Sequence, residues 1–285
     1  MNTPENSAFY QQFTQKNIGV YSHAQQERLK QARIIILGLG GVGGLEAMLA
    51  ARHGVGHITG VDPDTFETSN INRQMFAYTD TLGESKAAVA ERELKRINPE
   101  LRGEFLSISV DEHNAHELIA GHDLVLEALD DMCARVCVHR AAQKLGIPSI
   151  SMSGSPPHRG FISSFLPGGI DYETLLGLPS QGKPLTDEIK KSIREVKNKR
   201  AQYSVQLGAP QSWADDYCEG KAGWIITPIR AALLATFSVH EAIQILVGLS
   251  PLAAAPKALL IDLDNLESPV RVASPEHGVW PAEQF

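Results

Sequence analysis

Short apolar runs alternate with amphipathic or charged stretches through the first half of the chain. The run Ile34-Ile35-Ile36-Leu37 is wholly apolar, which is typical of a strand buried on both faces of a parallel sheet. Strands are predicted at 34–37, 58–61, 105–110, 124–129 and 149–151, and helices at 20–32, 44–53, 84–97 and from the acidic pair at 130–131 to about 145. Strands that alternate with helices in this way predict a parallel sheet with helices on both faces.

The second half of the chain is less regular. It predicts a strand at 159–166, a Gly- and Pro-rich loop at 167–185, a buried apolar helix at 226–247 and a late strand at 258–263. The charged helix at 186–200 has only a thin apolar stripe at Ile189, Ile193 and Val196, so it is either a solvated surface helix or a docking surface or flap over a site. The predicted fold class is α/β, a doubly wound, mostly parallel, Rossmann-like sheet with a smaller C-terminal extension of sheet and helix.

Composition narrows the class of protein. The chain has 285 residues, 43% of them hydrophobic and 21% charged, and its net charge of -7 argues against a general nucleic-acid binder. No apolar run reaches the roughly 18 to 20 residues that span a bilayer, and the polar N-terminus lacks a signal-peptide layout, so we expect a cytoplasmic protein with no membrane segment.

Cys133 and Cys137 share a helix face and are expected in the core. Among the histidines, we expect His139 at the surface and His240 in the core.

A glycine-rich turn follows the first predicted strand and opens a helix. It reads GLGGVGG, with Gly38, Gly40, Gly41 and Gly43 placed so that the backbone can approach a phosphate at a helix N-terminus. Asp62 ends the second strand about 20 residues later, where a carboxylate accepts hydrogen bonds from ribose hydroxyls. These features predict a nucleotide site, and an NAD-dependent oxidoreductase would show them too.

The segment after the second strand favours a triphosphate over a dinucleotide. Arg73 and Lys86 place two cations near the glycine turn, and cations of these types grip phosphate oxygens. We assign three neighbouring residues to the same nucleotide site, namely Asp64, Asn70 and Gln74. Asp130 follows the fourth strand, where a carboxylate can hold Mg²⁺ together with phosphate oxygens, while Asp131 is expected to cap the next helix.

These residues resemble the ThiF/MoeB/HesA family of adenylating enzymes, which includes relatives of the ubiquitin-activating enzymes. The segments that match are GLGGVGG, VDPDTFETSNINRQ, LGESK, the ALDD turn followed by Arg135, GIPSISMSGS, TPIRAALLATFSVHEAIQILVG and KALLIDLDNLESPVRV, so the resemblance covers most of residues 15–272. The SNINRQ and LGESK segments are specific to this family, whereas the glycine turn is not.

The resemblance implies an ATP- and Mg²⁺-dependent adenylyltransferase that acts on a carboxylate and releases pyrophosphate. Gly40 and Gly41 would approach the phosphates, while the triphosphate would be bound by Asn70, Arg73 and Lys86. We expect one adenylating domain over residues 1–285, with a nucleotide-binding half at about 20–153 and a substrate-binding and C-terminal half at about 154–285. A homodimer is implied as well.

Three departures from the family pattern matter. Lys16 stands where family members carry an arginine that reaches the partner subunit's ATP, and lysine keeps the charge but loses the bidentate fork. The paired Cys-x-x-Cys motifs that bind zinc in many relatives are absent, so no zinc is predicted. Cys218 precedes the long helix with one extra residue in the spacing of the family's covalent cysteine, and it is either catalytic or an incidental loop cysteine.

The carboxylate substrate stays open. It is a ubiquitin-like or sulfur-carrier protein, a ribosomally made peptide, or a tRNA nucleoside of the kind cyclised by tRNA threonylcarbamoyladenosine dehydratases. An NAD-dependent oxidoreductase and an inactive binding subunit are the alternatives outside this class.

Overall fold

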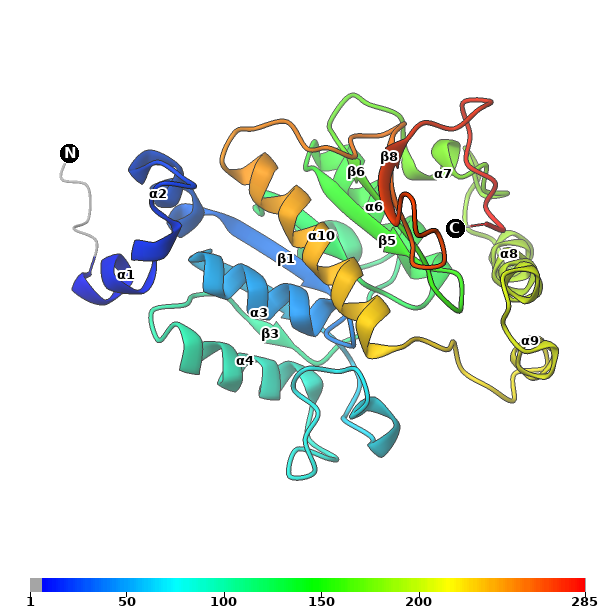
Figure 1. Ribbon diagram of the computed structural model, residues 1–285, viewed down its shortest axis with the longest axis horizontal. Coiled ribbons are helices and arrows are strands. Elements are labelled where there is room, and N and C mark those ends of the chain that lie inside the picture. The colour runs from blue at the N-terminus through cyan, green and yellow to red at the C-terminus, as the bar shows by residue number, and fades with distance from the viewer. Residues whose placement is uncertain (1–6, 285) are drawn as a thin grey trace.

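The computed structural model describes residues 7–284 (Figure 1). The strands are β1 (Arg33–Leu37), β2 (His57–Val61), β3 (Phe105–Leu106), β4 (Leu124–Glu127), β5 (Ser149–Ser153), β6 (Arg159–Phe165), β7 (Ala258–Asp262) and β8 (Val270–Ala273). The helices are α1 (Ala8–Phe13), α2 (His23–Gln31), α3 (Gly43–His53), α4 (Lys86–Ile97), α5 (Ala115–Ile119), α6 (Met132–Leu145), α7 (Tyr172–Leu175), α8 (Asp187–Gln206), α9 (Gln211–Cys218) and α10 (Pro228–Leu246). Two 3₁₀ turns are η1 (Gln15–Asn17) and η2 (Thr68–Asn70).

All eight strands of the described chain form one sheet, in the order β3-β2-β1-β4-β5-β6-β7-β8. The strands from β3 to β5 are parallel, and β6, β7 and β8 continue the sheet in antiparallel fashion. The chain winds outward from β1 to β3, returns to β4 beside β1, and then winds the other way. The predicted doubly wound sheet with a C-terminal extension is therefore confirmed, and its switch point lies between β1 and β4.

Helices cover both faces of the sheet. The largest apolar core joins one face of the strands to α3, α4 and α10, which lie in front of the sheet in Figure 1. A second core packs α5 and α6 on the opposite face, and a third joins α6 to β6, α7 and α8. Because β1 has a helix layer on each side, Ile34, Ile35, Ile36 and Leu37 are all buried, as an unbroken apolar run predicts.

Helix α10 corrects one expectation from the sequence. Within residues 7–284 it is the single helix with the length and apolar composition of a membrane span. It packs on α3 and on β4, β5 and β6, and it carries the buried charged residues Arg230 and Glu241. The Glu241 carboxylate accepts hydrogen bonds from Ser164 and from the backbone N–H groups of Leu252 and Ala253. These contacts are those of a core helix, and residues 1–6, part of the segment judged not to be a signal peptide, lie outside the described residues.

Several local expectations were wrong. The predicted loop at 167–185 contains α7, α8 runs on to Gln206, and β3 has only two residues where a strand was expected over 105–110. His139 is buried against Glu127 and Ser149, and His240 is exposed. His139 is buried because a helix embedded between layers buries polar positions that periodicity alone assigns to solvent, whereas His240 occupies an exposed position of α10. Cys133 and Cys137 are buried, as predicted.

Candidate functional site

A cavity of about 350 Å³ lies outside the carboxyl ends of β1, β2, β4 and β5. This is the place where open α/β sheets bind ligands, because the loops from the two winding directions diverge there. The cavity brings together three groups separated in sequence, the glycine turn, the cations Arg73 and Lys86, and the carboxylate Asp130. It is also lined by residues of α6, α8 and α10 that the sequence did not assign to a site.

The glycine turn has two separate structural duties. Gly38, Gly40 and Gly41 line the cavity, whereas Gly43 does not. Gly38 has φ of 93°, and a Cβ built on it would lie 2.5 Å from the Ala128 carbonyl oxygen, so the turn packs directly on the end of β4. A Cβ on Gly43 would lie 1.8 Å from the Gly38 carbonyl oxygen. Gly43 therefore lets α3 begin against the turn, while the other three place backbone at the wall of the cavity.

Asp62 and Lys86 are oppositely charged, buried side chains next to the glycine turn. One Asp62 carboxylate oxygen accepts the Leu39 backbone N–H at 2.7 Å, and the other accepts the Asp64 N–H at 2.9 Å. The Lys86 ammonium lies 2.9 Å from Asp64 and 3.9 Å from Asp62. Burial raises the pKa of Asp62, and the Lys86 ammonium opposes part of the rise. Asp62 thus fixes the turn, and each of its oxygens retains a lone pair for a hydroxyl donor.

Arg73 and Gln74 reach the cavity from the loop after β2, whereas Asn70 does not. Arg73 donates to the Ser69 carbonyl and to Asn72, and its Cγ would lie 3.1 Å from a Cβ on Gly41, so glycine is what admits it here. Gln74 is buried, and its Oε1 has no hydrogen-bond partner within residues 7–284. Asn70 instead accepts the Glu67 N–H, which makes it a residue that shapes η2.

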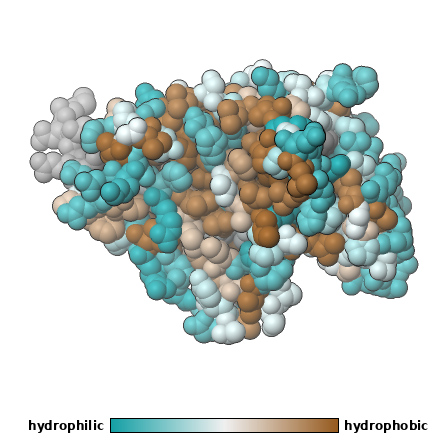
Figure 2. Space-filling model, in the orientation of Figure 1, coloured by the Kyte–Doolittle hydropathy of each residue, from teal (hydrophilic) through white to brown (hydrophobic). Residues whose placement is uncertain are grey.

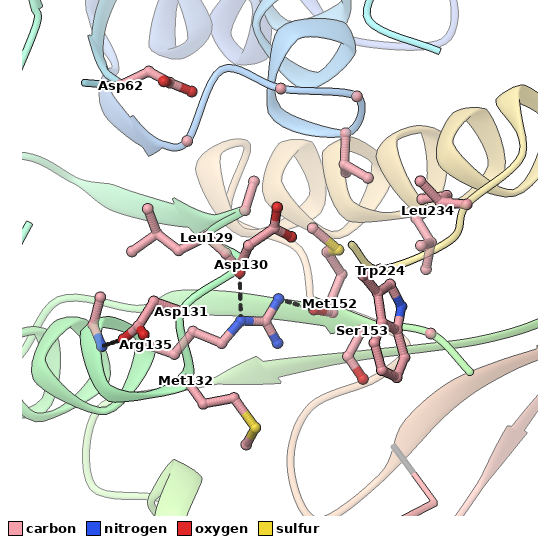
Figure 3. Close-up of a pocket in the computed structure, with 18 of the residues that line it drawn as sticks. Asp62, Leu129, Asp130, Asp131, Met132, Arg135, Met152, Ser153, Trp224 and Leu234 are labelled. Carbon is pink, nitrogen blue, oxygen red and sulfur yellow. Dashed lines mark hydrogen bonds between the residues drawn. The ribbon is translucent and has the colours of Figure 1, made fainter. Parts of the chain in front are cut away.

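Asp130 and Asp131 both line the cavity but differ in environment. The Asp131 carboxylate accepts the Ala134 N–H at 2.8 Å and caps α6, which confirms the prediction for this residue. The Asp130 carboxylate has no hydrogen bond or salt bridge within residues 7–284, and Figure 3 shows it directed into the open cavity. The same part of the chain holds no cluster of three or more His, Cys, Asp or Glu side chains able to bind a metal by themselves. A metal at Asp130 would therefore need ligands from a bound molecule, which is the arrangement Mg²⁺ prefers beside phosphates.

A buried ionic network supports the turn that carries Asp130. The Glu127 carboxylate lies 3.1 Å from Arg135 Nε and 3.5 Å from His139 Nε2. Arg135 also donates to the carbonyl oxygens of Leu129 and Met152, as the dashed lines in Figure 3 show. Burial alone would raise the pKa of Glu127, but Arg135 and His139 outweigh it and hold the pKa below its ordinary range. The network joins the ends of β4 and β5, so it fixes the middle of the cavity.

Three further cations line the cavity, and one of them, Arg200, contacts the last residue of β5. They are Lys197 and Arg200 on α8 and Arg230 on α10, with the Trp224 ring stacked near the first two. Figure 3 shows Ser153 and Trp224 at the opposite end of the cavity from Asp62. A signal for Arg200 existed in the sequence, because it continues the stripe of Ile189, Ile193 and Val196 at helical spacing. The alternative that α8 covers a site is thus the one that its placement favours over a solvated surface helix.

Lys16 and Cys218 lie outside the cavity. Lys16 is exposed on η1. Cys218 is half-buried at the end of α9, where its sulfur lies 3.8 Å from the Asn198 carbonyl oxygen and 3.7 Å from Gln202 Nε2. The nearest lysine in the sequence, Lys221, pairs with Glu219.

A match to a known family covers nearly the whole chain. The profile of the ThiF family matches residues 14–279. A sulfur carrier protein adenylyltransferase from Thermus thermophilus is 39% identical over 127 residues, 44% of this chain and 46% of that protein. A tRNA threonylcarbamoyladenosine dehydratase from Haemophilus influenzae is 27% identical over 186 residues, 65% of this chain and 67% of that protein. The chain spans about half the length of several curated relatives that it matches.

Solved structures share the fold at low sequence identity. A crystal structure of PaaA superposes with a TM-score of 0.72 at 19% identity, covering 96% of this chain and 76% of PaaA. Escherichia coli MccB with ATP gives a TM-score of 0.65 at 20% identity, covering 90% of this chain and 67% of MccB. Both likenesses extend over the sheet and its C-terminal extension together.

Proposed function

This chain belongs to the ThiF family, and from that premise we propose that it transfers AMP from ATP to a carboxylate of a peptide or small protein. A carboxylate oxygen of the substrate attacks the α-phosphorus of ATP, the bond to the bridging oxygen breaks, and pyrophosphate leaves. The product is an acyl-adenylate. No proton has to move, since the nucleophile is already ionised, so catalysis rests on alignment and on neutralisation of charge.

The two ends of the cavity bind different molecules, ATP at one end and the carboxylate substrate at the other. In the nucleotide-binding half, about 20–153, the glycine turn faces the phosphates and Asp62 accepts the ribose hydroxyls. Arg73 and Lys86 neutralise the triphosphate. The substrate enters from the other half, about 154–285, which contributes α8 and α10 to the cavity wall.

One observation carries the proposal, namely that Arg73, Lys86 and Asp130 line a single cavity together with the glycine turn. A dinucleotide-binding dehydrogenase has no need for a triphosphate-binding pair of cations opposite a free carboxylate. An inactive binding subunit would have no reason to keep all three.

The Asp130 carboxylate would hold Mg²⁺, with phosphate oxygens and water completing the coordination. When bound, the ion would supply charge neutralisation of the triphosphate. The unpaired state of this carboxylate within residues 7–284 fits that role. No zinc site is proposed.

Adjacent aspartates give a matched test. In an ATP–pyrophosphate exchange assay with candidate carboxylate substrates, Asp130→Asn should lower exchange by about 100-fold or more, since it removes a charged ligand of the ion. Asp131→Asn should stay within a few-fold of wild type, because asparagine caps a helix as well as aspartate does. Equal losses in the two variants, or exchange in neither wild type nor variants, would contradict the proposal.

A second candidate has one observation in its favour. Among the relatives named above, the alignment with the tRNA threonylcarbamoyladenosine dehydratase is the longer. If the carboxylate belongs to a tRNA nucleoside, exchange will depend on the modified tRNA and on no peptide. The net charge of -7 weighs against this candidate, because tRNA binding needs a basic footprint.

We also propose that the enzyme is a cytoplasmic homodimer in which Lys16 serves the partner's site. Apolar side chains are exposed on the loop after β2 and at the start of α10, and Figure 2 shows apolar surface in these regions. They are Ile71, Met75, Tyr78, Leu82, Ile225 and Ile229. Large exposed apolar patches mark interfaces. Analytical ultracentrifugation tests the dimer, and a monomer at micromolar concentration would refute it.

A further inference from the structure

Two buried guanidinium groups at the β5 end of the cavity have no anionic partner. Arg200 is 4% exposed and Arg230 is 1% exposed. Neither forms a salt bridge with any carboxylate of residues 7–284, and the Nε–H of each has no hydrogen-bond partner there. The third buried arginine of the described chain, Arg135, does have an anionic partner, since it lies against the Glu127 carboxylate.

The hydrogen bonds that these two groups do make go to neutral oxygens. Arg200 Nη2 donates to Ser153 Oγ at 2.9 Å, and Arg230 donates to the carbonyl oxygens of Pro157 and Ile225. Burial lowers the pKa of each guanidinium to about 10. A fully buried cation without a counter-ion is strongly unfavourable, so an anion bound between two such groups that line one cavity would stabilise the protein.

Arg200 and Arg230 lie at a different end of the cavity from the residues proposed to bind the triphosphate. Arg73 and Lys86 lie at the glycine turn, beside β1 and β2, whereas Arg200 contacts the last residue of β5. A Cβ on Gly154 would lie 2.8 Å from the Arg159 carbonyl oxygen and 3.5 Å from Arg230 Nε, so the backbone at Gly154 lies directly beside the guanidinium. A second hollow of about 210 Å³ also contains Gly154 and continues away from the nucleotide end. A substrate chain in this hollow would approach the cavity at Gly154, next to Arg230.

We propose that Arg200 and Arg230 bind an acidic side chain of the substrate, distinct from the carboxylate that is adenylated. This inference rests on the proposed function and names its substrate class, a peptide or protein segment with Asp or Glu next to the reacting carboxylate. Neighbouring strands are about 5 Å apart, and Asp130 and Ser153 follow and end the adjacent strands β4 and β5. The acidic residue is therefore close to the reacting carboxylate in the sequence of the substrate.

The reacting carboxylate itself is a poor ligand for this pair. Two guanidinium groups would occupy the oxygen lone pairs that must attack phosphorus, and they would lower the nucleophilicity of the carboxylate. A neighbouring carboxylate can be held firmly without that loss, and it then fixes the substrate in register.

Isosteric dipeptides test the proposal by binding rather than turnover. N-acetyl-Glu-Gly and N-acetyl-Gln-Gly are titrated calorimetrically into the protein saturated with Mg²⁺ and a non-hydrolysable ATP analogue. The Glu peptide should bind about 10-fold more tightly than the Gln peptide, since a charge-assisted contact is gained. In Arg200→Gln and in Arg230→Gln the ratio should fall to about one, while affinity for the ATP analogue stays within about two-fold.

The outcomes separate this inference from the proposed function. If the wild type binds the ATP analogue but does not distinguish Glu from Gln, or binds neither peptide, the arginine site is wrong and adenylation stands. If the wild type binds no ATP analogue, the proposed function itself fails. Should the Gln variants not fold, Arg200→Lys and Arg230→Lys keep the charge and should retain a reduced preference for Glu, whereas an unchanged preference would overturn the assignment.

Discussion

Glu46 on α3 gives a quantitative test of the electrostatics of this fold. Its side chain is 1% exposed between α3 and α10, and its Oε2 has no hydrogen-bond partner within residues 7–284. Burial raises the pKa of Glu46 from 4.5 to about 8, with Ser238 opposing and Glu127 adding to the rise. The folded protein therefore holds a proton on Glu46 at neutral pH that the unfolded chain releases.

The sign of the pH dependence follows from this difference. Between pH 4.5 and about 8 the folded state binds more protons at this site than the unfolded state, so the free energy of unfolding falls as pH rises. Integrating this linkage from pH 5.5 to 8.5 gives a loss of about 3 kcal/mol. Replacing Glu46 with Gln removes the titration but keeps the shape of the side chain.

The assay is urea denaturation of wild type and Glu46→Gln at pH 5.5, 7.0 and 8.5. Groups that titrate in both proteins cancel in the difference, so the variant should gain about 3 kcal/mol relative to wild type over this range. Glu117→Gln, at an exposed position on α5, is the control and should show a constant difference. A stability difference for Glu46→Gln that does not change with pH would refute the reasoning.

Three other outcomes follow from named contacts. Lys86→Ala should weaken ATP binding by about 100-fold, since it removes a charge-assisted contact. Fluorescence titration of an ATP analogue measures this affinity, and an unchanged affinity would contradict the nucleotide site. Glu127→Gln should lower the free energy of unfolding by about 3 kcal/mol, because it leaves Arg135 buried without its carboxylate; a loss under 1 kcal/mol in urea denaturation would mean that the network is not stabilising. Cys218→Ser should leave ATP–pyrophosphate exchange within about two-fold of wild type, because the thiol lies outside the cavity, and a large loss would restore a catalytic role in adenylate formation.

The sequence by itself determined the winding of the sheet and the nucleotide end of the cavity. Both depend on short segments of the sequence. An apolar run such as 34–37 requires a helix layer on each face of the sheet, and Gly38 adopts a backbone conformation that other residues avoid. Arg73 and Lys86 belong to the connection after β2 and Asp130 to the connection after β4, and the carboxyl ends of these strands meet at one edge of the parallel sheet. Their common cavity is therefore a consequence of topology.

Only the tertiary structure decided the end of the cavity that contains Arg200 and Arg230. The charged residues of α8 resemble those of a solvated helix, and Arg200 becomes a buried cation only where α8 packs against α6 and α9 and reaches Ser153 and Trp224. Arg230 and Glu46 likewise sit on helices whose burial depends on partners distant in sequence. The physical reason is that the cost of a charge depends on its surroundings in space, and a sequence specifies the charge without specifying what will surround it.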